Sequence, residues 1–91
     1  MGHLTDRDEI KKWLDKYGIE NYTINDDGSV DVDGDVDLSK RKLNKILVKF
    51  RIVTGLFSCA DNVLTSLENC PYRVGRDFYC INNKLTSLPL S

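Results

Sequence analysis

The sequence has few of the side chains that metal sites and nucleophilic enzymes use. It holds one histidine and three cysteines, and the cysteines form no Cys-x-x-Cys pair. A zinc site is therefore disfavoured, because zinc is held by several clustered cysteine and histidine ligands. A thiolate enzyme built on Cys70 lacks an evident base, and neither a glycine-rich phosphate loop nor paired carboxylates in a cleft are visible. We expect a protein that is not an enzyme and that needs no cofactor.

The sequence also lacks long apolar runs. No stretch reaches the roughly 18 consecutive apolar residues of a transmembrane helix, so we expect no membrane partner. The N-terminus carries charges and no apolar signal-peptide core, which favours the cytoplasm. A length of 91 residues is enough for one domain with a modest core, and we expect residues 1–91 to form it.

Charge is divided unevenly along the chain, although the net charge is only −1. Residues 1–37 carry eleven acidic and four basic side chains, whereas residues 38–91 carry nine basic and three acidic ones. The acidic string contains alternating carboxylates at Asp31, Asp33, Asp35 and Asp37. It does not fit a calcium loop, because the sixth and twelfth positions counted from Asp31 are Val36 and Lys42 instead of glycine and glutamate. We expect a solvated strand face with a negative patch.

One pattern is written twice, 21 residues apart. The two copies read Phe57-Ser-Cys59-Ala-Asp-Asn62-Val-Leu64-Thr-Ser-Leu67 and Phe78-Tyr-Cys80-Ile-Asn-Asn83-Lys-Leu85-Thr-Ser-Leu88. The same step taken backwards reaches an earlier copy at Val32, Leu38, Leu43 and Ile46. Apolar positions that recur with such a period indicate a solenoid whose turns stack on one another.

These residues resemble the strand and turn of a leucine-rich repeat, with aromatic residues and cysteines in the first two leucine places. The trailing Leu85-Thr-Ser-Leu88-Pro89 is similar to the short bacterial type of repeat. The whole arrangement also resembles uncharacterised repeat proteins of tailed bacteriophages. Arg41 departs from the pattern, because it stands where the earliest copy should have its asparagine.

Alternation along a strand predicts which side chains are buried in the repeat. Phe57, Cys59, Phe78 and Cys80 should face the core, while Ser58 and Tyr79 face solvent. Asn62 and Asn83 should satisfy backbone groups of their own turn and of the next one. The cysteines are expected to be free thiols, with Cys70 the most exposed.

The N-terminal part predicts a helix over residues 4–18. Thr5 or Asp6 can cap it, and Ile10, Trp13, Leu14 and Tyr17 form one apolar stripe. An Asp-Gly turn between residues 22–25 and residues 30–33 then predicts a β-hairpin. We expect an α+β fold in which this helix and hairpin, residues 1–33, cap a short parallel-strand leucine-rich-repeat-like solenoid of about two and a half repeats in residues 34–91.

The resemblance implies a protein-binding sheet made of the solvent-facing strand positions. The candidate partner-binding residues are Asp35, Asp37, Leu56, Ser58, Asp77, Tyr79 and Ile81, a mixture of outward apolar groups and carboxylates. We therefore expect a small protein-interaction module. The resemblance further implies a phage product that binds and modulates a protein in the host cytoplasm, as in host takeover or counter-defence.

Two other functions remain open. A nucleic-acid binder would use the basic stretch Lys40, Arg41, Lys42, Lys45, Lys49 and Arg51, which lacks the interleaved aromatic residues of a single-strand platform. The third reading is a structural fragment of a longer array. The C-terminal end, with Phe78, Leu85, Leu88 and Leu90, is expected to present an incompletely covered cross-section that contacts a second copy or the target protein.

Overall fold

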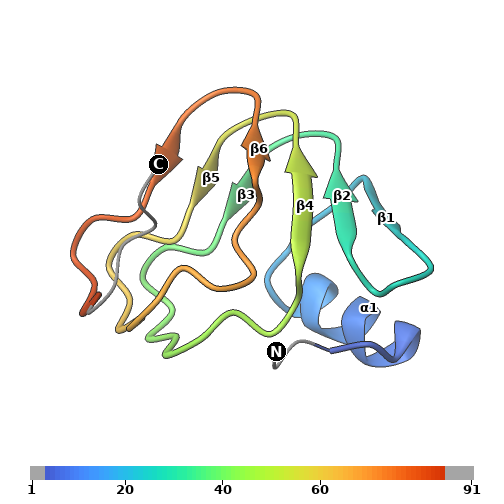
Figure 1. The fold of residues 1–91 in the computed structure, drawn as a ribbon, viewed down its shortest axis with the longest axis horizontal. Helices are drawn as coiled ribbons and strands as arrows, with labels where there is room; N and C mark the ends of the chain where they lie inside the picture. The colour runs from blue at the N-terminus through green and yellow to red at the C-terminus, as the bar shows by residue number, and fades with distance from the viewer. Residues whose placement is uncertain (1–3, 86–91) are drawn as a thin grey trace.

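The computed structural model describes residues 4–85, which form a mixed α+β fold with one helix and seven strands in two sheets. Figure 1 shows the helix and the first hairpin at one end of the molecule and the last strand at the other. Leu88 and Leu90 lie outside the described residues.

Helix α1 spans Arg7–Lys16, inside the predicted range. Asp6 is the N-cap, and its Oδ1 accepts a hydrogen bond from the Asp8 backbone N–H at 2.9 Å. The helix ends before Gly18, whose φ of 70° suits glycine. Ile10, Trp13 and Leu14 are buried, so the predicted apolar stripe is confirmed as the face that packs on the core.

The predicted hairpin is confirmed as strands β1 (Tyr22–Ile24) and β2 (Val30–Val32), which pair antiparallel. Its turn depends on Gly28, which has a φ of 87°. The carboxylate of Asp27 closes the turn by accepting hydrogen bonds from the N–H and hydroxyl of Ser29, at 2.9 and 2.6 Å. The hairpin thus places β2 as the strand on which the following parallel strands add.

The remaining strands pair in parallel in two sheets. One sheet has the order β1-β2-β4-β6 and contains β4 (Phe50–Val53) and β6 (Arg73–Val74). The other has the order β3-β5-β7, made of β3 (Val36–Asp37), β5 (Phe57–Ser58) and β7 (Phe78–Tyr79). Their register aligns Val36 with Phe57 and Phe57 with Phe78. The parallel alignment of the two sequence copies is therefore confirmed.

The backbone conformation repeats with the same spacing. Lys40, Asp61 and Asn82 all have a φ of 57°, which is a left-handed conformation that asparagine and aspartate tolerate better than most residues. Asn82 Nδ2 donates to Asp61 Oδ1 at 2.7 Å, joining two of these turns. Lys40 adopts the same left-handed conformation, although lysine lacks the short polar side chain that makes this conformation easier for aspartate and asparagine.

At Gly55, the backbone of the turn before β5 lies directly against the backbone of the turn before β3 at Gly34. A Cβ atom there would lie 2.7 Å from both the carbonyl carbon and the carbonyl oxygen of Gly34, and closer still to the Asp35 carboxylate. The Gly55 N–H donates to the Gly34 carbonyl at 2.9 Å, and Asp35 Oδ1 accepts from the Leu56 N–H at 2.9 Å. Only glycine permits this approach.

Asn62 ties the turn after β5 to the turn after β3. Its Nδ2 donates to the carbonyls of Leu38, Cys59 and Ala60, at 2.8, 3.0 and 3.1 Å. Its Oδ1 accepts from the N–H groups of Arg41 and Leu43, at 3.0 and 2.9 Å. The prediction that Asn62 satisfies backbone groups of its own turn is confirmed. The prediction that it also serves the next turn is wrong, because its other partners lie in the preceding turn.

Asn83 repeats this arrangement one step later. Its Nδ2 donates to the carbonyls of Cys59, Cys80 and Ile81, and its Oδ1 accepts from the Leu64 N–H at 3.0 Å. Asn83 is only half-buried, whereas Asn62 is 6% exposed. The two asparagines therefore make the same kind of link between turns, but Asn83 is more accessible to water than Asn62.

This difference yields a prediction about stability. Asn62→Ala should lower the free energy of unfolding by about 3 kcal/mol or more, because it leaves several buried backbone groups without partners. Asn83→Ala should cost about 1 to 2 kcal/mol, since water can reach part of its turn. Urea unfolding followed by circular dichroism measures both. Equal, small losses would contradict the linking role of Asn62.

Candidate functional site

The predicted solvent-facing residues lie on or next to the strands of the β3-β5-β7 sheet, but they differ in exposure. Asp35, Asp37 and Asp77 are exposed, and Leu56 is half-buried. The prediction that Ser58 faces solvent is wrong, because this residue is only 8% exposed. Ser58 lies between Asp37 and Tyr79 in the strand register, so larger neighbours cover its short side chain.

The acidic side chains on the early part of the sheet are used within the fold. Asp37 Oδ1 accepts hydrogen bonds from the Ser39 N–H and hydroxyl, at 3.0 and 2.6 Å, and these bonds lower the pKa of the Asp37 carboxyl. Asp33 Oδ1 accepts from the Thr54 hydroxyl at 3.0 Å. The acidic residues that were expected only to face solvent therefore also accept hydrogen bonds within the fold, and the bond from Thr54 to Asp33 connects neighbouring turns.

Large exposed hydrophobic side chains gather on β7 and directly after it. Phe78 is 40% exposed, Tyr79 45% and Ile81 64%, and we call these three residues the β7 patch. Charged residues flank the patch in sequence, with Arg76 and Asp77 before it and Lys84 after it, all exposed. The Tyr79 hydroxyl donates to Asp77 Oδ2 at 3.2 Å. The arrangement has the apolar centre and charged rim of a contact surface.

Phe78 corrects part of the sequence interpretation. Its equivalent Phe57 is fully buried, and their ring centroids lie 5.6 Å apart. An aromatic series continues inward from Phe57 to Phe50 at 5.3 Å and from Phe50 to Trp13 at 6.2 Å. Phe78 is the outer member, and no strand among residues 4–85 covers its far side. It is therefore a partly exposed edge residue, while Leu85 is half-buried.

The basic stretch is distributed over several surroundings. Arg51, in β4, forms a bidentate pair with Asp31 of β2, with Nε to Oδ1 at 2.9 Å and Nη2 to Oδ2 at 2.5 Å. The guanidinium group of Arg41 lies 5.6 Å from the centre of the Tyr17 ring. Two cations of the predicted patch are thus engaged within the chain.

The other four cations of the stretch are exposed. Lys40 and Lys42 lie in the turn after β3 with positive φ angles of 57° and 58°, and Lys45 and Lys49 follow before β4. The stretch begins at the end of one sheet and finishes in the other. One phosphate backbone would therefore contact fewer of these positive charges at the same time than their spacing in the sequence suggested.

The three cysteines are free thiols. Cys59 is buried, and both Cys70 and Cys80 are half-buried, so the expectation that Cys70 is the exposed cysteine is wrong, because Cys70 is not exposed. A hydrogen bond with Cys59 and burial raise the pKa of Cys70, and burial raises the pKa of Cys80. These two thiols stay protonated at neutral pH, which makes them poor nucleophiles.

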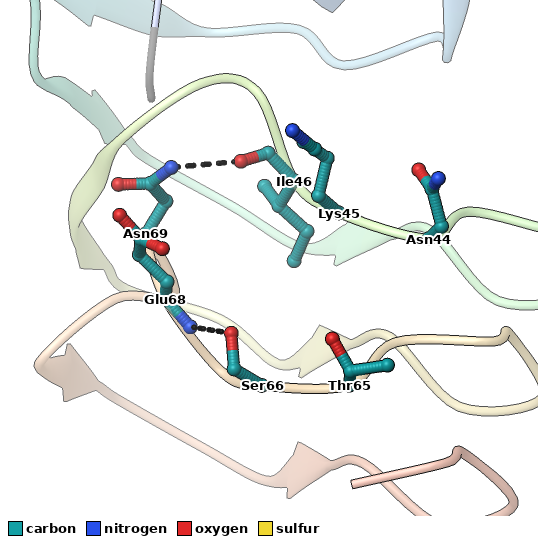
Figure 2. A pocket seen from close by; sticks show the side chains of 7 residues that line it. All are labelled: Asn44, Lys45, Ile46, Thr65, Ser66, Glu68 and Asn69. Atoms are coloured by element: carbon teal, nitrogen blue, oxygen red, sulfur yellow. Dashed lines mark hydrogen bonds between the residues drawn. The ribbon is translucent and has the colours of Figure 1, made fainter. Parts of the chain in front are cut away.

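A small hollow of about 150 Å³ lies between residues 44–46 and residues 65–69, and Figure 2 shows the side chains that line it. Asn69 Nδ2 donates to the Ile46 carbonyl at 2.8 Å across it, and Lys45 and Glu68 also line it. The repeat step places residue 44 beside residue 65, so sequence could predict that these segments meet but not that they leave a hollow. Its volume is below that of typical small-molecule sites.

No protein-family model, curated protein or solved structure matches this chain. Across residues 4–85, no helix combines the length and the apolar character that crossing a lipid bilayer requires. A functional assignment must therefore come from the geometry and chemistry of the surface itself.

The contrast between the two equivalent phenylalanines can be measured. Phe57→Ala should lower the free energy of unfolding by about 3 to 5 kcal/mol through cavity formation. Phe78→Ala should cost about 1 to 2 kcal/mol, because much of its ring already contacts water. Phe57→Leu serves as a folded control for the buried site. Similar losses for the two alanine variants in urea titrations would refute the edge position of Phe78.

The Arg51 pair predicts a pH effect. Hydrogen bonds from Arg51 lower the pKa of Asp31, so its stabilising contribution is present above the unfolded-state pKa of about 3.9 and is lost as pH falls through the folded-state value. Arg51→Gln should lower the free energy of unfolding by about 1 kcal/mol at pH 7 and by less below about pH 3.

The exposed pair between Lys11 and Asp15, at 3.1 Å, supplies the control for this measurement. Lys11→Gln should change the free energy of unfolding by only about 0.3 kcal/mol. Urea unfolding at a series of pH values measures both variants. A loss in Arg51→Gln that does not shrink in acid would show that its packing, and not the ion pair, stabilises the fold.

Proposed function

We propose that this chain is a small protein-interaction module whose contact surface is the β7 patch. The observation that carries the proposal is the difference between equivalent positions on adjacent strands. Phe57, Ser58 and Ala60 are at most 8% exposed, whereas Phe78, Tyr79 and Ile81 are 40 to 64% exposed. At two of these three positions the later turn also carries the larger side chain, with Tyr79 in place of Ser58 and Ile81 in place of Ala60. Aromatic groups at the centre of an interface commonly dominate its binding energy.

We infer that the fold belongs to the leucine-rich-repeat-like solenoids, with α1 and the β1-β2 hairpin as its cap. Three features support this inference: strand registers that advance by one repeat, left-handed residues that recur at Lys40, Asp61 and Asn82, and asparagines that link successive turns. In such folds each turn contacts only its neighbours. An interaction surface at the last turn is then compatible with a stable core elsewhere.

The origin and setting of the module form a further part of the proposal. The repeated unit resembles those of tailed-bacteriophage proteins, which favours a phage product acting in the bacterial cytoplasm on a host protein. Modulation of that protein in host takeover or counter-defence is the function that this resemblance implies. The exposed patch supports the binding step, and the resemblance supports the choice of a host partner.

The nucleic-acid alternative has less support. Arg51 pairs with Asp31 and Arg41 lies against Tyr17, so part of the basic stretch serves contacts within the chain. Phosphate binding that relied on the remaining lysines should weaken steeply with salt. A purely structural fragment would leave the β7 patch without a role.

Capture from bacterial lysate tests the proposal. Immobilised wild type is compared with a Tyr79→Ala/Ile81→Asp variant at about 50 and about 500 mM salt, and bound proteins are quantified by mass spectrometry. We expect a specific protein that the wild type retains at both salt concentrations and the variant loses. A Val63→Asp variant is the matched control, because Val63 is another exposed apolar residue, at 36%, outside the patch.

Each other result changes the proposal in a defined way. Capture of nucleic acid that disappears at high salt, and that Lys40→Glu/Lys42→Glu abolishes, would favour the nucleic-acid function. Identical capture by wild type and the patch variant would exclude the β7 patch as the contact surface. Circular dichroism of each variant verifies that loss of binding does not reflect unfolding.

A further inference from the structure

Burial changes abruptly between two equivalent turns of the chain. In residues 51–64, which we call the inner turn, more than half of the positions are buried, and Phe57, Cys59 and Leu64 are fully buried. In residues 72–85, the same positions one repeat later, no residue is buried. We call this last described turn the outer turn. It therefore contributes little of the apolar burial that stabilises a fold.

Backbone hydrogen bonds do not compensate for this difference, because the two turns make equivalent ones. The Val63 N–H of the inner turn donates to the Leu43 carbonyl at 2.9 Å, and the equivalent Lys84 N–H of the outer turn donates to the Leu64 carbonyl at 2.9 Å. The two turns thus have the same kind of polar link to the turn before them. They differ in how much apolar surface they remove from water.

The boundary of the outer turn lies at Pro71. Pro71 is buried, and the half-buried Cys70 before it is hydrogen-bonded to Cys59 of the inner turn. Every residue from Tyr72 to Leu85 is exposed or half-buried. The chain can therefore detach after Pro71 while Cys70 keeps its packing on the core.

The outer turn covers Cys59 and Phe57. The Cys59 N–H donates to the Tyr79 carbonyl at 2.9 Å, and the Cys59 carbonyl accepts from Asn83 Nδ2 at 3.0 Å. The ring of Phe57 packs on that of Phe78 at a centroid distance of 5.6 Å. Loss of the outer turn would therefore free the Cys59 backbone and admit water to a thiol that is otherwise completely buried.

We propose that the outer turn opens as a unit while the rest of the fold stays intact, and that this opening exposes the Cys59 thiol to solvent. Within residues 4–85 the outer turn has a neighbouring turn on one side only. In repeat folds each turn contacts only its neighbours, so such a turn can detach without unfolding the others. The opening is a property of the chain alone, and it does not depend on the proposed function.

The opening makes the outer turn a point at which binding can be regulated. The β7 patch lies entirely on the outer turn, so opening also removes this patch from its place beside β5. A ligand that binds the closed outer turn opposes the opening, and a ligand that binds the uncovered inner turn favours it. Each ligand can only shift the equilibrium toward the state that it binds better.

Amide hydrogen exchange of the intact chain under reducing conditions, followed by NMR, tests the proposal. The N–H groups of Phe57 and Cys59, which we call the β5 amides, donate to the outer turn at 2.9 Å. Those of the equivalent Val36 and Leu38, the β3 amides, donate to the inner turn at 2.8 Å. After correction for intrinsic rates, the β5 amides should exchange at least about tenfold faster, because the opening alone releases them.

Urea distinguishes the two kinds of opening in the same experiment. Low urea should speed exchange of the β3 amides more than that of the β5 amides, because global unfolding exposes more surface than detachment of one turn. Equal exchange rates with equal urea dependence in the two pairs of amides would overturn the proposal.

Matched variants at the two ends of the molecule separate local opening from global unfolding. Asn83→Ala removes hydrogen bonds between the outer and inner turns, whereas Ile10→Val removes one methyl group from the buried face of α1 at the other end (Figure 1). Asn83→Ala should speed exchange of the β5 amides by about tenfold. Ile10→Val should speed exchange of the β3 amides and leave the β5 amides unchanged. Acceleration of the β5 amides by Ile10→Val as large as that by Asn83→Ala would contradict a local opening.

Thiol labelling tests the exposure of Cys59 itself. In a Cys70→Ala/Cys80→Ala variant Cys59 is the single thiol, so excess N-ethylmaleimide reports its exposure as a gain in mass. We expect labelling through the same opening that releases the β5 amides of this variant, with acceleration by Asn83→Ala and none by Ile10→Val. Labelling that is only as fast as global unfolding of the variant would overturn the exposure of Cys59.

Discussion

The fold depends on the hydrogen bonds that Asn62 makes between successive turns. Each short strand pairs over only two residues in the β3-β5-β7 sheet, so strand pairing alone gives each turn few backbone hydrogen bonds. Asn62 adds five bonds at the point where the chain leaves the strand. Because its amide group has both donors and an acceptor, it satisfies carbonyl and N–H groups that hydrophobic residues would leave unpaired. The turn is thus fixed by polar contacts around an apolar core.

Hydrogen bonds between successive turns explain why polar side chains of the earlier turns have partners within the chain, whereas those near β7 have fewer. Asp31, Asp33 and Asp35 each accept a hydrogen bond from a residue of the following turn, and Asn62 accepts one from the preceding turn. Such links require a following turn. At β7 no following turn lies within residues 4–85, and Arg76 and Lys84 are exposed and form no ion pair with any other residue of that described range. Arg76 and Lys84 are accessible to a partner because they lie in the last turn that the structure describes.

Sequence reasoning predicted the elements whose causes are local or periodic. The stripe of Ile10, Trp13 and Leu14 gave the helix, the Asp-Gly turn gave the hairpin, and the repeat gave the register of Phe57 against Phe78. It failed for Ser58, Cys70 and Arg51, whose exposure or pairing is decided by neighbours on other strands. The repeat pattern alone does not distinguish an inner turn from an outer one, although the expected incompletely covered cross-section did include Phe78. Burial of Phe57 and exposure of Phe78 are properties of position in the stack.

The difference between inner and outer turns determines which residues stabilise the fold and which can bind a partner. An inner repeat must keep its apolar groups buried, because losing them creates cavities. The last described strand makes fewer such contacts, so its apolar groups contribute less to folding and can be used for recognition at lower cost in stability. Phe78 serves both purposes: one face of its ring packs on Phe57 at a centroid distance of 5.6 Å, and 40% of the residue stays exposed. An aromatic side chain of a partner that packed on Phe78 would extend the series from Trp13 by one member, and binding would then use the same packing that holds the fold together.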